Sequence, residues 1–212
     1  MKTKIIVLMA FLISHFSLSQ EIFFKVGKNF TQYNYKNSSG KTLSGLEGTT
    51  GSNYEFGFVY FLDDAKDSLK SRFSYSASLN LNQFNAKAGN VNNIYVWNTN
   101  YIGIQNMVYA SVLTSNNNYF NLKFKAGVNT STIVSGKQYI NNVMYDLKNY
   151  DEFKGLIIQP LVGMDFQVEV SRELSLNLGY LFSKAFNVSN KSSENLSFTN
   201  NQIQLGLFYT LY

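Results

Sequence analysis

The alternation of apolar and polar residues is the feature of this 212-residue chain that most restricts its fold. It is clearest in four segments, at 73–82, 120–129, 174–183 and 202–211. Successive side chains of a strand point to opposite faces, so each segment predicts a strand with one apolar and one polar face. Strands of globular proteins usually have about 5–6 residues. These longer segments suit the roughly 9–11 residues that a strand needs to cross a bilayer.

The rest of the chain predicts four less regular strands and a regular order of connections. These strands lie near 22–33, 54–61, 99–112 and 155–170. Long polar links at 34–53, 85–98, 133–153 and 185–197 alternate with shorter links at 62–70, 113–118 and 171–173. This order is typical of membrane barrels, whose long loops lie outside and whose short turns face the periplasm. The sequence therefore predicts an all-β fold: an eight-stranded antiparallel up-and-down transmembrane β-barrel with four long outer loops and three short periplasmic turns.

The first residues of the chain resemble a secretory signal peptide. Lys2 and Lys4 precede a mostly apolar stretch at 5–16, and small residues follow at Ser17 and Ser19. This order is typical of a cleaved signal, and the apolar stretch is short for a membrane helix of about 20 residues. We expect residues 1–19 to be the signal peptide, with cleavage before Gln20 or Glu21, and residues 20–212 to be the barrel domain. Export then predicts the outer membrane of a diderm bacterium.

Removal of the signal peptide would limit the chemistry available to the chain. His15 is the only histidine, and no cysteine is present. A nucleophilic serine needs a neighbouring base, which in such sites is most often an imidazole. We therefore expect no enzymatic activity, no catalytic residues and no cofactor. Arg72 and Arg172 are the only arginines and the lysines are scattered, which argues against nucleic-acid binding.

Two groups of carboxylates are candidate chemical sites. Asp146, Asp151 and Glu152 could form a catalytic pair, but a solvated loop is the favoured interpretation. Asp63, Asp64 and Asp67 could bind Ca²⁺, but they lack the spacing of a calcium loop. We interpret the second group as a polar turn and predict no metal site.

Charged residues on the polar faces of the strands are candidates for a network inside the barrel. They are Lys25, Glu55, Lys123, Lys125, Asp165 and Glu169. An eight-stranded barrel is only wide enough for its own side chains, so charges inside must pair or meet trapped water. With residue 132 placed opposite residue 154, Lys123 is expected to contact Asp165 or another lumen carboxylate. We predict a plug of ion pairs; a narrow proton or ion path is the alternative.

Aromatic residues near the strand ends predict two girdles at the membrane interfaces. The periplasmic group comprises Phe23, Phe61, Phe73, Tyr109, Tyr119, Phe120 and Tyr209. The outer group comprises Tyr33, Tyr54, Trp97, Tyr101, Phe153 and Phe182.

The mature chain resembles the PorT-like family of outer-membrane β-barrels. The resemblance rests on Leu18-Ser19-Gln20, on the opening strand Phe24-Lys25-Val26-Gly27-Lys28-Asn29-Phe30 and on strand-centre glycines in Phe124-Lys125-Ala126-Gly127, Val162-Gly163-Met164 and Leu178-Gly179-Tyr180. It implies an outer-membrane barrel and supplies no catalytic residues. The C-terminus resembles a barrel-assembly signal that ends in an aromatic residue, although Tyr212 is out of phase with the apolar stripe of the last strand.

These patterns favour a non-enzymatic outer-membrane protein with a structural or surface-binding role. Its expected partners are outer-membrane lipid, the barrel-assembly machinery and a protein or surface polymer at the outer loops, whose Asn, Ser, Tyr and Gly content suits recognition. The first alternative is an accessory subunit of an outer-membrane secretion or assembly machine. The second is a soluble periplasmic lipid-binding barrel.

Overall fold

The computed structural model describes residues 21–42, 45–63, 71–90, 93–114, 120–141, 143–150, 152–189 and 195–211. Its strands are β1 (Glu21–Lys36), β2 (Glu47–Phe61), β3 (Phe73–Asn90), β4 (Asn93–Thr114), β5 (Phe120–Ile140), β6 (Val143–Asp146), β7 (Leu156–Glu169), β8 (Leu174–Asn187) and β9 (Asn195–Thr210). Within these ranges no helix is long and apolar enough to cross a membrane.

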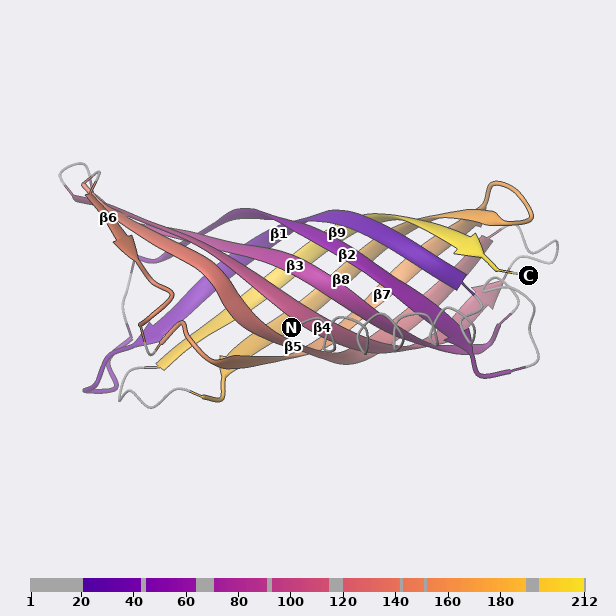
Figure 1. Ribbon diagram of the computed structural model, residues 1–212, viewed down its shortest axis with the longest axis horizontal. Coiled ribbons are helices and arrows are strands. Elements are labelled where there is room, and N and C mark those ends of the chain that lie inside the picture. Colours follow the sequence, from indigo (N-terminus) through magenta and orange to yellow (C-terminus); the bar gives the residue numbers. More distant parts are fainter. Residues whose placement is uncertain are drawn as a thin grey trace, which may run out of the picture.

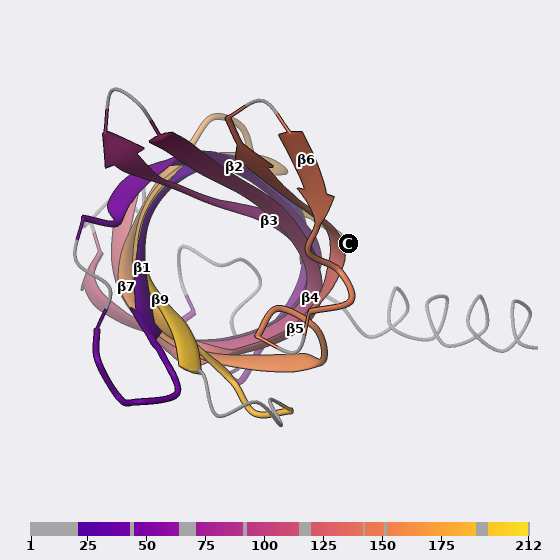
Figure 2. The same cartoon turned by 90° about the vertical axis from the view of Figure 1, so that its left-hand side faces the viewer.

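The strands close into a ring. The hydrogen-bonded order is β4-β3-β2-β1-β9-β8-β7-β5-β6, and a further pairing between β4 and β5 completes the circle. Of these nine strands, β6 pairs only with the end of β5, which leaves eight in the ring. Figure 2 shows this ring viewed along the barrel. The predicted all-β, eight-stranded antiparallel barrel is confirmed.

The two ends of the barrel differ. The end at which β2, β4 and β7 finish and β3, β5 and β8 begin is called the turn end; it also holds the start of β1 and the end of β9. The opposite end is called the loop end and carries β6. In Figure 1 the loop end is on the left and the turn end, with the C-terminus, is on the right.

Alternation along each strand separates an apolar exterior from a polar interior. In β8, for example, Leu176 and Leu178 are exposed whereas Ser175 and Asn177 are buried. The same pattern continues around the ring, so the exterior is covered by exposed Leu, Ile, Val, Phe and Tyr side chains. This distribution is the reverse of a soluble protein, in which the apolar face of a sheet packs away from the solvent.

Several strands extend further toward the loop end than the sequence predicts. The predicted link 85–98 is mostly paired strand, because β3 and β4 remain in register as far as Asn90 and Asn93. The predicted link 133–153 contains the end of β5 and all of β6. At these ends apolar and aromatic residues do not alternate with polar ones, since the first residue of β4 is followed by Ile94, Tyr95, Val96 and Trp97 and β6 reads Val-Met-Tyr-Asp, so hydrophobic periodicity does not detect them.

The predicted aromatic girdles are partly wrong. Six of the proposed girdle residues are buried inside the barrel: Phe23, Phe61, Tyr109, Tyr33, Tyr101 and Phe153. Position along a strand sets the depth of a side chain, but whether its place in the alternation is odd or even sets the face; the five strand residues have the same place as the inward polar residues, whereas Phe153 lies on a turn before β7. Phe73, Tyr54, Phe182 and Tyr209 do lie on the exterior. Tyr119 lies outside the described residues, as do Tyr212 and the predicted signal peptide, so those interpretations stay predictions.

The inward aromatics close the lumen near both ends. At the turn end Phe23, Val59, Phe61 and Phe208 form one cluster, in which Phe23 stacks on Phe208. At the loop end a larger cluster is built around Tyr33, Phe84, Tyr101 and Phe198. Lys25, Glu55 and Asp165 therefore lie between two apolar clusters, whereas the buried polar residues Glu21 and Thr210 lie at the turn end, beyond Phe23.

Candidate functional site

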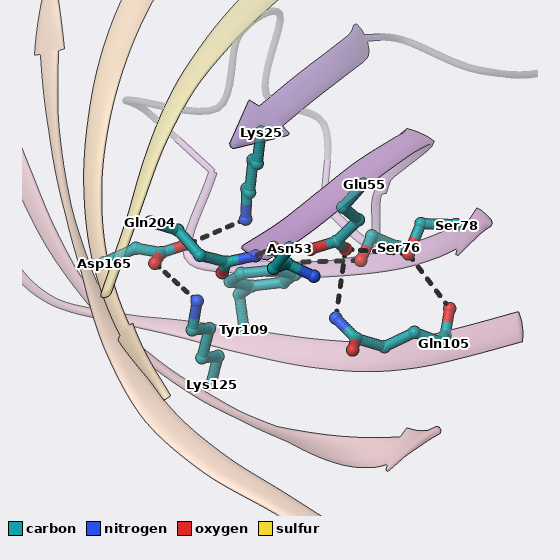
Figure 3. A network of polar contacts seen from close by, with 10 residues as sticks. All are labelled: Lys25, Asn53, Glu55, Ser76, Ser78, Gln105, Tyr109, Lys125, Asp165 and Gln204. Atoms are coloured by element: carbon teal, nitrogen blue, oxygen red, sulfur yellow. Dashed lines mark hydrogen bonds and ion pairs between the residues drawn. The ribbon is translucent and has the colours of Figure 1, made fainter. Parts of the chain in front are cut away.

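Asp165 is the centre of the ion pairs in the lumen. It lies on β7 with 2% of its surface exposed, and Lys125 of the neighbouring strand β5 donates to it at 2.6 Å. Lys25 reaches it from β1, which is not adjacent to β7, at 3.2 Å. Figure 3 shows the two ammonium groups approaching the carboxylate from different sides of the barrel. One carboxylate thus ties together three strands.

Lys25 is fully buried, yet its ammonium group has several stabilising contacts. Besides Asp165, it lies 4.8 Å from the ring centre of Phe23, 5.2 Å from that of Phe208 and 5.7 Å from that of Tyr109. Aromatic faces attract cations, and the attraction is larger when the cation is shielded from water. The aromatic closure of the turn end therefore also holds the buried charge of Lys25.

Glu55 is held by neutral donors. Its Oε1 accepts hydrogen bonds from Ser78 at 2.7 Å and from Gln105 at 3.0 Å, while its Oε2 accepts one from Gln204 at 2.9 Å. The amide of Gln204 also donates to Asn53 (Figure 3). A buried carboxylate is tolerated when hydrogen bonds replace its hydration.

Side-chain amides continue this network toward the loop end. Asn53 donates to Asn82, Asn82 to Asn80, Asn80 to Asn129 and Asn129 to Gln159. The donors and acceptors come from β2, β3, β5 and β7, so the chain of bonds runs across the lumen and not along one strand. A connected polar network of this kind fixes the packing of the interior.

The charges buried in the lumen balance. Among the described residues the buried charged side chains are Glu21, Lys25, Glu55, Lys123, Lys125 and Asp165, three of each sign. A conducting path needs a continuous aqueous route, whereas Lys25, Glu55, Lys125 and Asp165 are buried and held by ion pairs or hydrogen bonds.

Two glycines make room for the central ion pairs. Gly179 lies opposite Asp165 in the register of β7 and β8, and an added Cβ there would lie 2.4 Å from the Asp165 Oδ1. Gly206 lies opposite Lys25, and an added Cβ would lie 2.8 Å from the Cγ of that lysine.

We expect Gly179→Ala to destabilise the barrel by about 1–3 kcal/mol, because the methyl group displaces the Asp165 carboxylate from its lysines. Urea unfolding in lipid vesicles measures the change. Ala77→Val, which adds apolar atoms on the outer face, is the control and should change stability little. An unchanged midpoint for Gly179→Ala would show that the ion pairs do not need this space.

The predicted network residues fall into three groups. Lys25, Lys125 and Asp165 are brought together, and Glu55 is buried close by but bonded to Ser78, Gln105 and Gln204. Lys123 is inward and buried and lies directly opposite Asp165, because residue 132 pairs with Leu156 and not with residue 154. Glu169 is half-buried at the end of β7, at the turn end of the lumen. The contact of Lys25 with Asp165 was not predicted, since strand register does not give contacts across a lumen.

Asp63 and Asp146, from the two carboxylate groups considered as chemical sites, have structural roles, whereas Glu152 lines the loop-end pocket. Asp63 accepts hydrogen bonds from the backbone N–H groups of Arg72 and Phe73, which fixes the turn. Asp146 accepts one from the N–H of Lys148. Asp64, Asp67 and Asp151 lie outside the described residues. In the described part of the chain no three His, Cys, Asp or Glu side chains lie close enough to hold a metal ion.

The loop end also contains a pocket of about 400 Å³ above the aromatic closure. Its walls include Tyr33 and Tyr35 of β1, Trp97 of β4 and Gln138 of β5. The segment that follows β6 contributes Leu147, Tyr150, Glu152 and Phe153, and Leu46 and Leu196 complete the lining. The sequence did not predict this pocket, because Trp97 and Tyr33 were expected in girdles and residues 133–153 in one loop.

Comparison with solved structures shows the same fold. The alignment with the outer membrane protein OprG of Pseudomonas aeruginosa covers 92% of this chain and 97% of OprG, with a TM-score of 0.53 and 11% sequence identity. The outer membrane protease OmpT of Escherichia coli (91% and 97%, TM-score 0.48, 9% identity) and Neisserial surface protein A (89% and 97%, TM-score 0.45, 10% identity) match less closely. At such identities the likeness to OprG establishes the barrel fold and no activity.

No protein-family model matches the chain, and no curated protein sequence matches it. The PorT-like resemblance therefore stays a prediction, whereas the similarity to small outer-membrane β-barrels is found.

Proposed function

We propose that this chain is a non-enzymatic integral outer-membrane β-barrel with a closed lumen, which displays its loop end at the cell surface for binding. The observation that carries the proposal is the inverted polarity of the ring, with apolar side chains outside and a charge-balanced polar network inside. Only a closed barrel or a helix satisfies its backbone hydrogen bonds in lipid.

The inverted polarity also distinguishes the proposal from a soluble lipid-binding barrel. Such a protein would need a polar exterior and an apolar cavity that is wide enough for a lipid tail. Here the exterior carries exposed residues such as Phe56, Phe124 and Leu205, and the interior holds Lys25 and Asp165. No feature of the described residues favours the accessory-subunit alternative over a role of the barrel by itself.

The first test is the location and heat behaviour of the protein. We expect it to fractionate with outer membranes, to require detergent for extraction and to migrate differently on gels before and after heating, because a closed ring resists unfolding by detergent. Recovery in the soluble periplasmic fraction would contradict the proposal.

The second test is conductance. Because the lumen is filled by paired side chains between two aromatic closures, the purified barrel should give no stable porin-sized current in a planar bilayer. A porin recorded under the same conditions is the control. Reproducible long-lived steps from the barrel would show an open lumen and would contradict the plug.

A further inference from the structure

Hydrogen bonds hold the outer wall of the loop-end pocket, which the described residues 147–150 and 152–154 form. The N–H of Leu147 donates to Gly136, and that of Phe153 donates to Tyr150. From β8 the amide of Asn187 donates to the carbonyl groups of Glu152 and Lys154. Because these hydrogen bonds already order the wall, ligand binding would require little further ordering of the chain.

The floor of the pocket separates it from the lumen. Tyr33 packs on Phe198 with ring centres 5.1 Å apart and on Phe153 at 6.5 Å. The hydroxyl of Tyr33 donates to the carbonyl of Phe84, which keeps the ring in place. Because the buried cluster of Tyr33, Phe84, Tyr101 and Phe198 lies between the pocket and the lumen, we expect a ligand to enter from the loop end.

The lining combines flat aromatic surfaces with polar groups of both kinds. Trp97 stacks beside Tyr95, with ring centres 6.1 Å apart, and lies directly opposite Gln138 in the register of β4 and β5. A glutamine side chain both donates and accepts, a carboxylate such as Glu152 accepts, and a tyrosine hydroxyl does either. A sugar ring needs this mixture, because its C–H faces pack on aromatic rings while its hydroxyl groups need donors and acceptors at the edge.

Aromatic rings beside a carboxylate also bind quaternary ammonium groups, but the net positive charge of the loop end disfavours the binding of a cation. In the sequence, segments 36–53, 85–98, 133–154 and 185–197 contain seven lysines and five carboxylates: Lys36, Lys41, Lys87, Lys137, Lys148, Lys154 and Lys191 against Glu47, Asp146, Asp151, Glu152 and Glu194. This excess repels cations and attracts neutral or acidic polymers.

We propose that the pocket binds one sugar unit of a polysaccharide, with the ring packed on Trp97 and its hydroxyl groups bonded by Gln138 and Glu152. The volume of about 400 Å³ lies within the range of small-molecule sites and holds one or two sugar rings. The proposal rests on the proposed function, because it takes the loop end to face the outside of the cell. The glycan is either that of the cell's own lipopolysaccharide or one from its surroundings.

Trp97 is the only tryptophan of the chain, so its fluorescence reports on this site alone. The full barrel is purified in a polyoxyethylene detergent, because glycoside detergents would present sugar to the pocket. It is titrated with oligosaccharide released from lipopolysaccharide in one arm and with lactose, maltose and chitobiose in the other. We expect a saturable change with a dissociation constant of about 1 mM or below in one arm, and that arm identifies the source.

Matched variants connect the signal to the pocket. Gln138→Ala should weaken saccharide binding by about tenfold, as expected for the loss of hydrogen bonds to the ligand. Gln32→Ala removes an exposed amide from the outer face of β1 and should leave binding unchanged. Heat-dependent migration on gels shows that each variant is folded before it is titrated.

Three results would overturn the proposal. One is a folded barrel whose fluorescence does not saturate with any saccharide. Another is saccharide binding that Gln138→Ala leaves unchanged. The third is a fluorescence response to tetramethylammonium chloride, with none to the saccharides, that is lost in the Glu152→Gln variant. This result would show that the pocket binds cations. None of these concerns the membrane, so failure here leaves the proposed outer-membrane role intact, and fractionation tests that role separately.

Discussion

Replacing Asp165 with asparagine is expected to destabilise the barrel by about 3–5 kcal/mol, the cost typical of removing one partner from a buried ion pair. The loss leaves Lys25 and Lys125 without their shared carboxylate, and both are almost fully buried. The midpoint of urea unfolding in lipid vesicles measures the change. Lys125→Met in the Asp165→Asn background should restore part of the stability, because it removes one of the two uncompensated charges.

The control is an ion pair of the same chemistry that is exposed to water. At the loop end Lys87 and Glu47 lie 2.8 Å apart, with 54% and 67% of their side chains exposed. The lysine lowers the pKa of Glu47 through its hydrogen bond and charge. Exposed pairs contribute little, so Glu47→Gln should shift the unfolding midpoint far less than Asp165→Asn. Equal shifts would mean that water reaches Asp165 and that the lumen is not closed.

The sequence was sufficient to predict the barrel because its two faces differ in chemistry. Alternation around Leu79 and Leu178 placed the strands, and parity placed Lys25, Glu55 and Asp165 inside. The predicted register of β5 and β7 is wrong by two residues. Lys123 and Asp165 nevertheless lie on the same face, because a shift by an even number of residues does not change the face.

The parts that the sequence did not predict depend on contacts between distant strands. The pairing of Lys25 with Asp165 spans the lumen, and no spacing along the chain encodes it. The loop-end pocket needs β1, β4 and β5 together with Leu147, Tyr150, Glu152 and Phe153, whose segment a hydrophobic pattern shows only as a polar link. The two aromatic clusters could have been predicted from the sequence, because Phe23 and Tyr33 lie an even number of residues from Lys25 on the same strand and therefore point inward with it.

The second large effect is expected on the exterior. Leu178 lies midway along the outward apolar residues of β8, which run from Leu174 to Phe182, and it is 51% exposed. Leu178→Arg should cost about 2–4 kcal/mol, as expected for a charge at the centre of the bilayer. Unfolding in vesicles of defined lipid measures it, and the equivalent substitutions at Leu79 and Phe124 should have similar costs.

Arginine substitutions at different depths in the bilayer should distinguish this effect from a general intolerance of arginine. Val188 is 55% exposed beyond the end of β8, past the outward Lys184, so Val188→Arg should cost close to nothing. Thinner bilayers should reduce the cost of Leu178→Arg, because the charge then lies nearer to the headgroups. Asn177→Arg, which crowds the lumen, should cost the same in thin and thick bilayers. If Leu178→Arg were equally insensitive to thickness, Leu178 would not face lipid and the assignment of the two faces would be wrong.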